Sequence, residues 1–237
     1  VDDRFLFINQ NFRFLRNNLL YHGVEAINGR VADLGVSFRQ FDDPARGFSY
    51  RFDSELDMRM SQSAGKTAAD IVNGCTQEQL RKILKEYGEF RNAGAIASAI
   101  VEHRKNNPLR TTLDLVESVS NYLPVRSENK YLSRLFQALR MEVNREMEFL
   151  REMLLQAQEM LVRGGRIAVV AYHSIEDRLV KNFFRTGNFE GLEKKDFYGN
   201  PGSPFVLVNR KVISPSEDEI MHNRRARSAR LRIAEKK

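Results

Sequence analysis

The hydrophobic positions of this 237-residue chain follow two different periods, and each predicts one kind of element. Short apolar runs predict strands over 4–9, 29–34, 167–171, 205–213 and 229–234. Apolar residues at helical spacing predict helices over 12–22, 67–73, 76–87, 92–105, 111–122 and 135–161, and another after residue 174. Thr76 with Gln79 forms a capping-box pattern, and Gly164 with Gly165 is expected to end the longest helix. This order predicts an α/β fold with an inserted helical block.

The stretch AVVAYHSIEDRLVKNFF changes from an apolar strand to an amphipathic helix within a few residues. The polar and titratable side chains at this junction are Tyr172, His173, Ser174, Glu176 and Asp177. Ser174 and Asp177 have the spacing of a helix cap, in which a hydroxyl accepts a free amide and a carboxylate suits the positive helix end. Capping requires neither His173 nor Glu176. These two are therefore candidates for a chemical role. For Ser174 and Asp177 the sequence does not decide between a helix cap and a functional site.

Asp33 ends the strand predicted over residues 29–34. Ligands of open α/β sheets bind beyond the carboxyl ends of parallel strands. Asp33 and the polar cluster Tyr172–Ser174 both follow predicted strands, so we expect them to line a common crevice.

The chain is moderately basic, with 38 Lys and Arg residues against 31 Asp and Glu residues and a net charge of +7. This balance favours polyanionic partners such as nucleic acid. The C-terminal run that contains Arg225 and Arg227 fits either a phosphate-binding loop or a solvated surface. Phe48 and Tyr50 alternate with polar residues, which fits either the buried face of an edge strand or an aromatic surface for stacking bases.

Other kinds of site are disfavoured by what the sequence lacks. The four histidines have no second ligand at metal spacing, so no metal site is expected. No glycine-rich loop of the GxGxxG or GxxxxGKS/T type occurs. The one cysteine, Cys75, fits a reducing compartment, and no apolar run approaches the ~20 residues that span a bilayer. We expect a cytoplasmic protein that does not contact a membrane.

Several long motifs together resemble the RsmH/MraW family of bacterial methyltransferases. They are ADLGVSFRQFDDPARGFSYRFDSELDMRM, GEFRNAGAIASAIV, FQALRMEVNREM, GGRIAVVAYHSIEDRLVKNFF and NRRARSARLRIAEK, in the family's order and spacing. The resemblance implies a Rossmann-like class I methyltransferase sheet, incomplete at the N-terminus, with an inserted all-helical domain. It also implies S-adenosyl-L-methionine-dependent methylation of the exocyclic N4 of a cytidine in the decoding centre of 16S rRNA, in the small ribosomal subunit.

The same resemblance implies the organisation of the chain. Residues 1–54 and 134–237 would form a discontinuous methyltransferase domain, and residues 55–133 a helical substrate-recognition insert. The family pattern assigns cofactor contacts by position to Phe12, Asp33 and Gln40. Candidate catalytic residues, which could accept an N–H of the weakly nucleophilic cytosine amine, are Asp33, His173 and Glu176. Contacts with RNA are expected from Phe48, Tyr50, Tyr172, Ser174, Arg225 and Arg227.

The chain departs from the family pattern at single positions and in one long segment. Tyr172 stands for a phenylalanine, Phe38 for a small serine, Ser54 for a glycine and Arg224 for a proline. Family members also begin with a D-G-T-x-G-x-G-G-H-S loop and a strand ending in an acidic residue, which hold the methionine and ribose parts of the cofactor. The printed sequence starts after both. We therefore expect a longer natural protein, and poor cofactor binding by the printed chain alone.

Two other classes of function compete with this interpretation. The same basic chain could be a ribosomal RNA-binding or assembly protein that performs no chemistry, and saturable binding of S-adenosyl-L-methionine would separate the two. An amino-methyltransferase acting on DNA is disfavoured, because the usual D/N/S-P-P-Y/F/W motif is replaced by Asp33-Leu34-Gly35-Val36. The sequence leaves the oligomeric state open.

Overall fold

The structure is a computed structural model that describes residues 2, 4–63, 65–124, 126–193 and 202–237. Its contacts divide the chain into two compact units. The sheet unit comprises Val1–Gly35 and Met147–Lys237, and the helical unit comprises Val36–Glu146.

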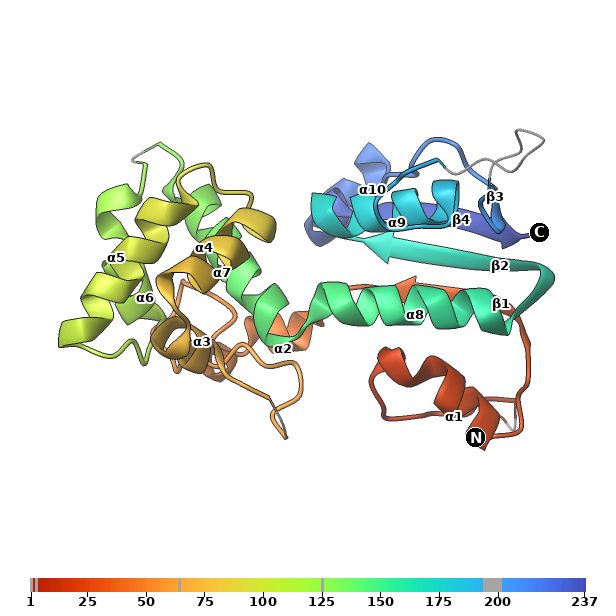
Figure 1. Cartoon of the computed structure of the whole chain (residues 1–237), viewed down its shortest axis with the longest axis horizontal. Helices are drawn as coiled ribbons and strands as arrows, with labels where there is room; N and C mark the ends of the chain where they lie inside the picture. The colour runs from red at the N-terminus through yellow and green to blue at the C-terminus, as the bar shows by residue number, and fades with distance from the viewer. Residues whose placement is uncertain (1, 3, 64, 125, 194–201) are drawn as a thin grey trace. The chain divides into compact units, whose positions relative to one another are not determined.

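In the described part of the sheet unit, four strands form one mixed sheet in the order β1-β2-β4-β3 (Figure 1). The strands are β1 (Ile27–Asp33), β2 (Leu161–Ala171), β3 (Phe205–Leu207) and β4 (Arg230–Lys236). β1 runs parallel to β2, whereas β4 is antiparallel to both β2 and β3. The mixed sheet and its helices confirm the α/β class expected from the sequence.

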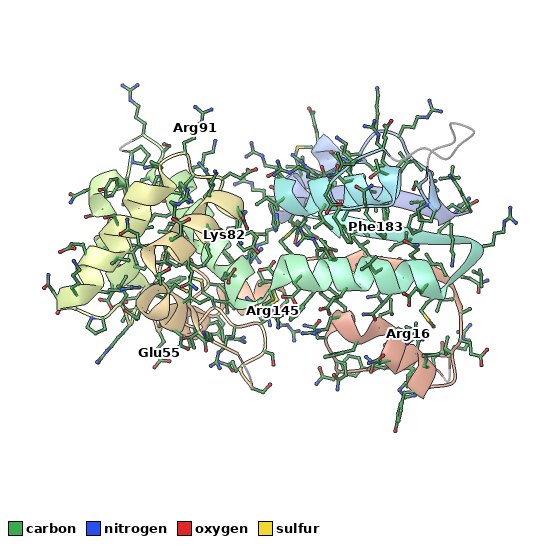
Figure 2. The ribbon with its side chains drawn as sticks, in the orientation of Figure 1. Arg16, Glu55, Lys82, Arg91, Arg145 and Phe183 are labelled. Atoms are coloured by element: carbon green, nitrogen blue, oxygen red, sulfur yellow. The ribbon has the colours of Figure 1, made fainter. Side chains whose placement is uncertain are left out.

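Helix α9 (Ser174–Thr186) follows β2 directly and packs against β2, β3 and β4. Phe183, labelled in Figure 2, and Phe184 are fully buried on its apolar face, and both rings lie close to Phe205 of β3. Burying a side chain of this size stabilises a fold by about 1.5–3 kcal/mol. This packing fixes the position of the turn that leads from β2 into α9.

The other helices that the structure describes in the sheet unit are η1 (Phe12–Phe14), α1 (Leu15–Tyr21), α8 (Glu146–Met160), α10 (Glu217–His222) and η4 (Arg224–Ser228). Polar contacts join the N-terminal helices to α8. Arg13 Nε lies 3.0 Å from Glu152 Oε2, and the side chain of Gln156 donates to the carbonyl oxygen of Arg13 at 2.6 Å.

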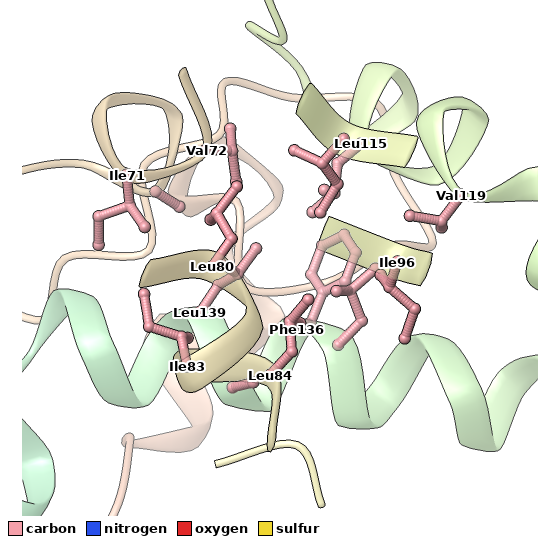
Figure 3. Close-up of a cluster of buried hydrophobic side chains, with 14 of the residues drawn as sticks. Ile71, Val72, Leu80, Ile83, Leu84, Ile96, Leu115, Val119, Phe136 and Leu139 are labelled. Carbon is pink, nitrogen blue, oxygen red and sulfur yellow. The ribbon is translucent and has the colours of Figure 1, made fainter. Parts of the chain in front are cut away.

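The helical unit packs its helices around one apolar core (Figure 3). Its described helices are α2 (Phe38–Asp42), η2 (Pro44–Arg46), α3 (Ala68–Gly74), α4 (Gln77–Glu86), α5 (Ala93–Asn106), α6 (Thr112–Ser118), η3 (Ser120–Tyr122) and α7 (Glu128–Val143). Thr76 caps α4 in the box with Gln79 that the sequence predicts, and Thr67 and Thr111 cap α3 and α6 in the same way.

The helical unit extends beyond both ends of the insert expected over residues 55–133. Phe48, before the expected start, and Leu139, after the expected end, are both buried in the helical core. The bounds of the expected insert follow from the family resemblance, which does not record which core a side chain joins.

The single long helix expected over residues 135–161 is wrong, because the chain forms α7 and α8 with a break between them. Arg145 at the break has a left-handed backbone (φ +49°). The Asn144 side chain accepts the Met60 N–H at 2.7 Å and donates to the Met58 carbonyl at 2.8 Å. These long-range bonds hold the break, and helical periodicity alone does not reveal them.

Two strand predictions and one predicted helix end also need correction. Residues 4–9 form no strand, since an apolar run needs a neighbouring ladder, and Phe7 of this run is 75% exposed. Gly164 and Gly165 lie inside β2 instead of ending a helix, at an irregularity in the register with β1. The strand expected over 205–213 is shortened to β3, with an isolated bridge between Ile213 and Leu231.

No helix in the described ranges is long and apolar enough to cross a membrane.

Candidate functional site at the carboxyl ends of β1 and β2

The two parallel strands β1 and β2 end side by side, as the sequence predicts. Asp33, the last residue of β1, pairs with Val170, and the next amide, of Leu34, donates to the Val170 carbonyl at 3.0 Å. One residue beyond β2, the Tyr172 hydroxyl donates to Asp33 Oδ1 at 2.9 Å. The expectation that Asp33 and the Tyr172–Ser174 cluster share one end of the sheet thus agrees with the geometry at Asp33 and Tyr172.

The pKa of Tyr172 is raised to about 12. Burial of the phenol is the largest cause, followed by its hydrogen bond to Asp33 and by the negative charges of Asp33 and Glu176. Tyr172 therefore remains a neutral donor at physiological pH, and Asp33, which is exposed, remains accessible to solvent on its other side.

Glu176 lies beneath this turn, with only 3% of its surface exposed. Its Oε2 accepts the backbone N–H of Tyr172 at 3.1 Å, and its Oε1 lies 3.1 Å from His173 Nε2 without the geometry of a hydrogen bond. These contacts give Glu176 a structural task, because they fix the backbone from which the Tyr172 side chain projects.

The cap of α9 differs from the pattern read from the sequence. The helix begins at Ser174 and its cap residue is His173, whose Nδ1 accepts the Glu176 N–H at 3.4 Å. Ser174 is instead an exposed first helical residue. An imidazole replaces the expected hydroxyl because the backbone of residue 173 is extended, as a cap residue requires.

Asp177 forms an ion pair with the sheet and does not complete a capping box with Ser174. Its oxygens lie 2.6 Å and 3.1 Å from two guanidinium nitrogens of Arg232 on β4, and 3.4 Å from Arg230. Asp177 is 7% exposed, so the two arginines supply the charge that a buried carboxylate needs. Sequence reasoning missed Arg232, although Arg230 and Arg232 share one face of a strand by their two-residue spacing.

The other residues expected to bind the cofactor occupy separate positions. Phe12 begins η1 and is 36% exposed, and it belongs to the sheet unit. Gln40 belongs to the helical unit, where its amide oxygen accepts the Ser37 N–H at 3.2 Å and its NH₂ group donates to the Met60 carbonyl at 3.0 Å. Gln40 thus shapes the start of the helical unit, whatever else it binds.

The residues expected to contact RNA divide into buried and exposed groups. Phe48 is 4% exposed, and the Tyr50 ring packs edge-on against Phe136 of the same core. Both rings therefore face a core, as the buried-face alternative expects, but residues 48–50 form no edge strand. Arg225 and Arg227 lie on the short helix η4 and are exposed. Of these four side chains, the two arginines are the ones that the fold presents to solvent as cations.

The parallel pair β1-β2, extended by antiparallel strands and bearing an exposed acidic side chain at its carboxyl end, defines the class of the protein: a class I methyltransferase fold. The family model described as the MraW methylase family matches residues 1–237, and the chain belongs to this family.

Curated relatives agree with this assignment. The chain is 53% identical over 236 residues to a protein of Bacteroides thetaiotaomicron, and 51% identical over 235 residues to one of Flavobacterium johnsoniae. It is 48% identical over 236 residues to a protein of Cytophaga hutchinsonii. Each is named ribosomal RNA small subunit methyltransferase H. The matches cover 99–100% of this chain and 78–79% of the relatives.

Proposed function

We propose that the protein uses S-adenosyl-L-methionine to methylate the exocyclic N4 of a cytidine in the decoding centre of 16S rRNA. The observation that carries the proposal is the exposed Asp33 carboxylate at the end of β1, oriented by the Tyr172 hydroxyl. The names of the relatives, which specify ribosomal RNA of the small subunit, support the class of substrate.

The chemistry of the side chains fits the proposed cofactor. When bound, S-adenosyl-L-methionine supplies a methyl group on a positively charged sulfur. The Asp33 carboxylate would attract this charge, and the half-exposed ring of Phe12 offers an apolar surface for the adenine.

The protein's own chemical task is to accept a proton. The cytosine amine is a weak nucleophile because its lone pair is delocalised into the ring, and after methylation the nitrogen must lose a proton. Asp33 is the best placed proton acceptor, because its carboxylate is exposed and accepts a hydrogen bond from one neutral group, the Tyr172 hydroxyl. Glu176 and His173 hold the turn beneath it, and they affect the reaction through that turn.

The RNA would meet exposed cations of the sheet unit. Arg225 and Arg227 on η4 offer the charges that phosphate groups require, and Ser174 is exposed at the start of α9. The helical unit would contribute to substrate recognition with surface cations such as Lys82 and Arg91 (Figure 2).

The test is transfer of a tritiated methyl group from S-adenosyl-L-methionine to small ribosomal subunits that lack the modification, followed by identification of the modified nucleoside. Asp33→Asn is expected to lower turnover about 10²–10⁴-fold. Asp218→Asn, at an exposed aspartate of α10, is the matched control and should leave turnover unchanged. In a protein that also carries the glycine-rich loop of the family pattern, binding of the subunits without methyl transfer or saturable cofactor binding would instead identify a non-catalytic RNA-binding protein.

A further inference from the structure

Within the described part of the chain, Tyr172 is the one side chain that forms a hydrogen bond with the proposed proton acceptor, from its hydroxyl to Asp33 Oδ1. We propose that Tyr172 is a positioning residue: it holds one carboxylate oxygen of Asp33 so that the other oxygen faces the substrate amine. This inference rests on the proposed function, in which Asp33 accepts the N–H of the target base.

Tyr172 is held at both of its ends. Its backbone N–H donates to the buried Glu176 carboxylate at 3.1 Å, and its hydroxyl reaches Asp33 at 2.9 Å. Between these points the ring lies over Gly35, where an added methyl group would sit 3.9 Å from Tyr172 Cδ2. Gly35 has a left-handed backbone (φ +95°), a conformation that favours glycine. A side chain fixed in this way can orient its partner.

The direction of the hydrogen bond follows from the chemistry of both groups. An ionised carboxylate only accepts, and a phenol whose pKa is about 12 stays protonated at any pH at which the enzyme works. Tyr172 is therefore the donor and Asp33 the acceptor of the hydrogen bond that the structure contains. Since the structure describes no other side-chain hydrogen bond or ion pair of Asp33, the second oxygen is the one left for a ligand.

The competing role for Tyr172 is direct contact with RNA, as the sequence analysis expects. The two roles predict different kinetics. A contact that binds RNA equally in the ground and transition states changes KM, whereas misalignment of the proton acceptor changes kcat. The hydroxyl can be removed alone, because Tyr172→Phe keeps the ring over Gly35.

The first measurement is steady-state methylation of undermethylated small subunits by Tyr172→Phe. We expect kcat to fall by about tenfold, with the KM values for the subunits and for S-adenosyl-L-methionine unchanged and the melting temperature preserved. Tyr21→Phe, at an exposed tyrosine of α1, should behave as the unaltered protein. An increased KM for the subunits at constant kcat would overturn the inference in favour of direct RNA contact.

A spectroscopic measurement tests the contact without relying on activity. In protein labelled with ¹³Cζ-tyrosine, the Tyr172 resonance, assigned by its loss in Tyr172→Phe, should shift in Asp33→Ala and stay in place in Asp218→Ala. An unchanged Tyr172 resonance in Asp33→Ala would refute the contact. If the unaltered protein transfers no methyl group, the proposed function fails. If Asp33→Asn retains full turnover, the role of Asp33 as proton acceptor fails, and the positioning role of Tyr172 fails with it. If Asp33→Asn is inactive while Tyr172→Phe keeps its kcat, only the positioning role fails.

Discussion

Two aspartates of the sheet unit, Asp33 and Asp177, are placed in opposite environments by the same fold. Asp33 is exposed at the end of β1 and has one neutral hydrogen-bond donor, Tyr172. Asp177 is 7% exposed on α9 and is surrounded by the positive charges of Arg232 and Arg230. One carboxylate retains capacity for a ligand, and the other is fully used by the fold.

This contrast is the physical ground on which we propose a functional role for Asp33 and a structural role for Asp177. A buried carboxylate needs full charge compensation, which consumes its ability to bind anything else. An exposed carboxylate with a single neutral donor keeps its charge and one free oxygen. Sequence alone places both residues beside the same junction, so burial and partner charge make the distinction.

The largest expected effect concerns activity at the two aspartates. Asp33→Asn should lower turnover about 10²–10⁴-fold with little change in melting temperature, because its carboxylate is exposed. Asp177→Asn should keep its turnover per folded molecule within about twofold, since Asp177 faces β4. Methyl transfer normalised to the folded fraction measures both. Equal losses of turnover in the two variants would contradict the division.

The second effect concerns stability, for which we expect the substitution of Asp177 to have a large effect and the substitution of an exposed aspartate a small one. Asp177→Ala leaves the partly buried Arg232 without its partner and should cost about 2–4 kcal/mol in the free energy of unfolding. Asp218→Ala, in the exposed pair with His222, should change it by less than about 0.5 kcal/mol. Chemical denaturation monitored by circular dichroism gives both values. A loss below about 1 kcal/mol for Asp177→Ala would show that the ion pair is not structural.

The third effect concerns Glu176. This residue is buried like Asp177, but it supports the turn that carries Tyr172, the partner of Asp33. Glu176→Ala leaves the Tyr172 N–H without its acceptor, so we expect a loss of about 1–3 kcal/mol in unfolding free energy. We also expect a reduction in turnover smaller than that of Asp33→Asn. Glu176→Gln keeps an acceptor oxygen, so it should retain most of the stability and most of the turnover that Glu176→Ala loses. If Glu176→Gln is as inactive as Asp33→Asn, the Glu176 charge acts directly in the reaction.

The sequence predicts the features that depend on neighbouring residues. It fails to predict those that depend on contacts with residues far away in the chain. The Thr76 capping box and the strand end at Asp33 depend on neighbouring residues, and the structure contains both. The break at Asn144 depends on bonds to Met58 and Met60, more than 80 residues away, so helical periodicity extends the helix through it.

The candidate site follows the same rule. The cluster from Tyr172 to Asp177 is visible as a sequence motif, but its division of tasks is not. Asp177 has the spacing of a capping residue, but it forms an ion pair with Arg232, 55 positions later. Tyr172 is a departure from the family pattern whose partner, Asp33, lies 139 positions earlier. Charge and spacing therefore indicate where the candidate site lies, and the tertiary contacts are the basis of the roles that we propose for its residues.

The smallest expected effect is the pH dependence of stability that Tyr172 contributes. Its pKa is about 12 in the folded protein, mainly because the phenol is buried, and close to the ordinary value of about 10 in the unfolded chain. Between these values the unfolded chain releases a proton that the folded protein retains. The contribution is therefore complete below pH ~10 and is lost as the pH rises towards ~12. The melting temperature should fall more steeply over this range in the unaltered protein than in Tyr172→Phe. Parallel slopes for the two proteins would mean that the phenol does not sense Asp33, and the exposed carboxylate would then lack the donor that distinguishes it from Asp177.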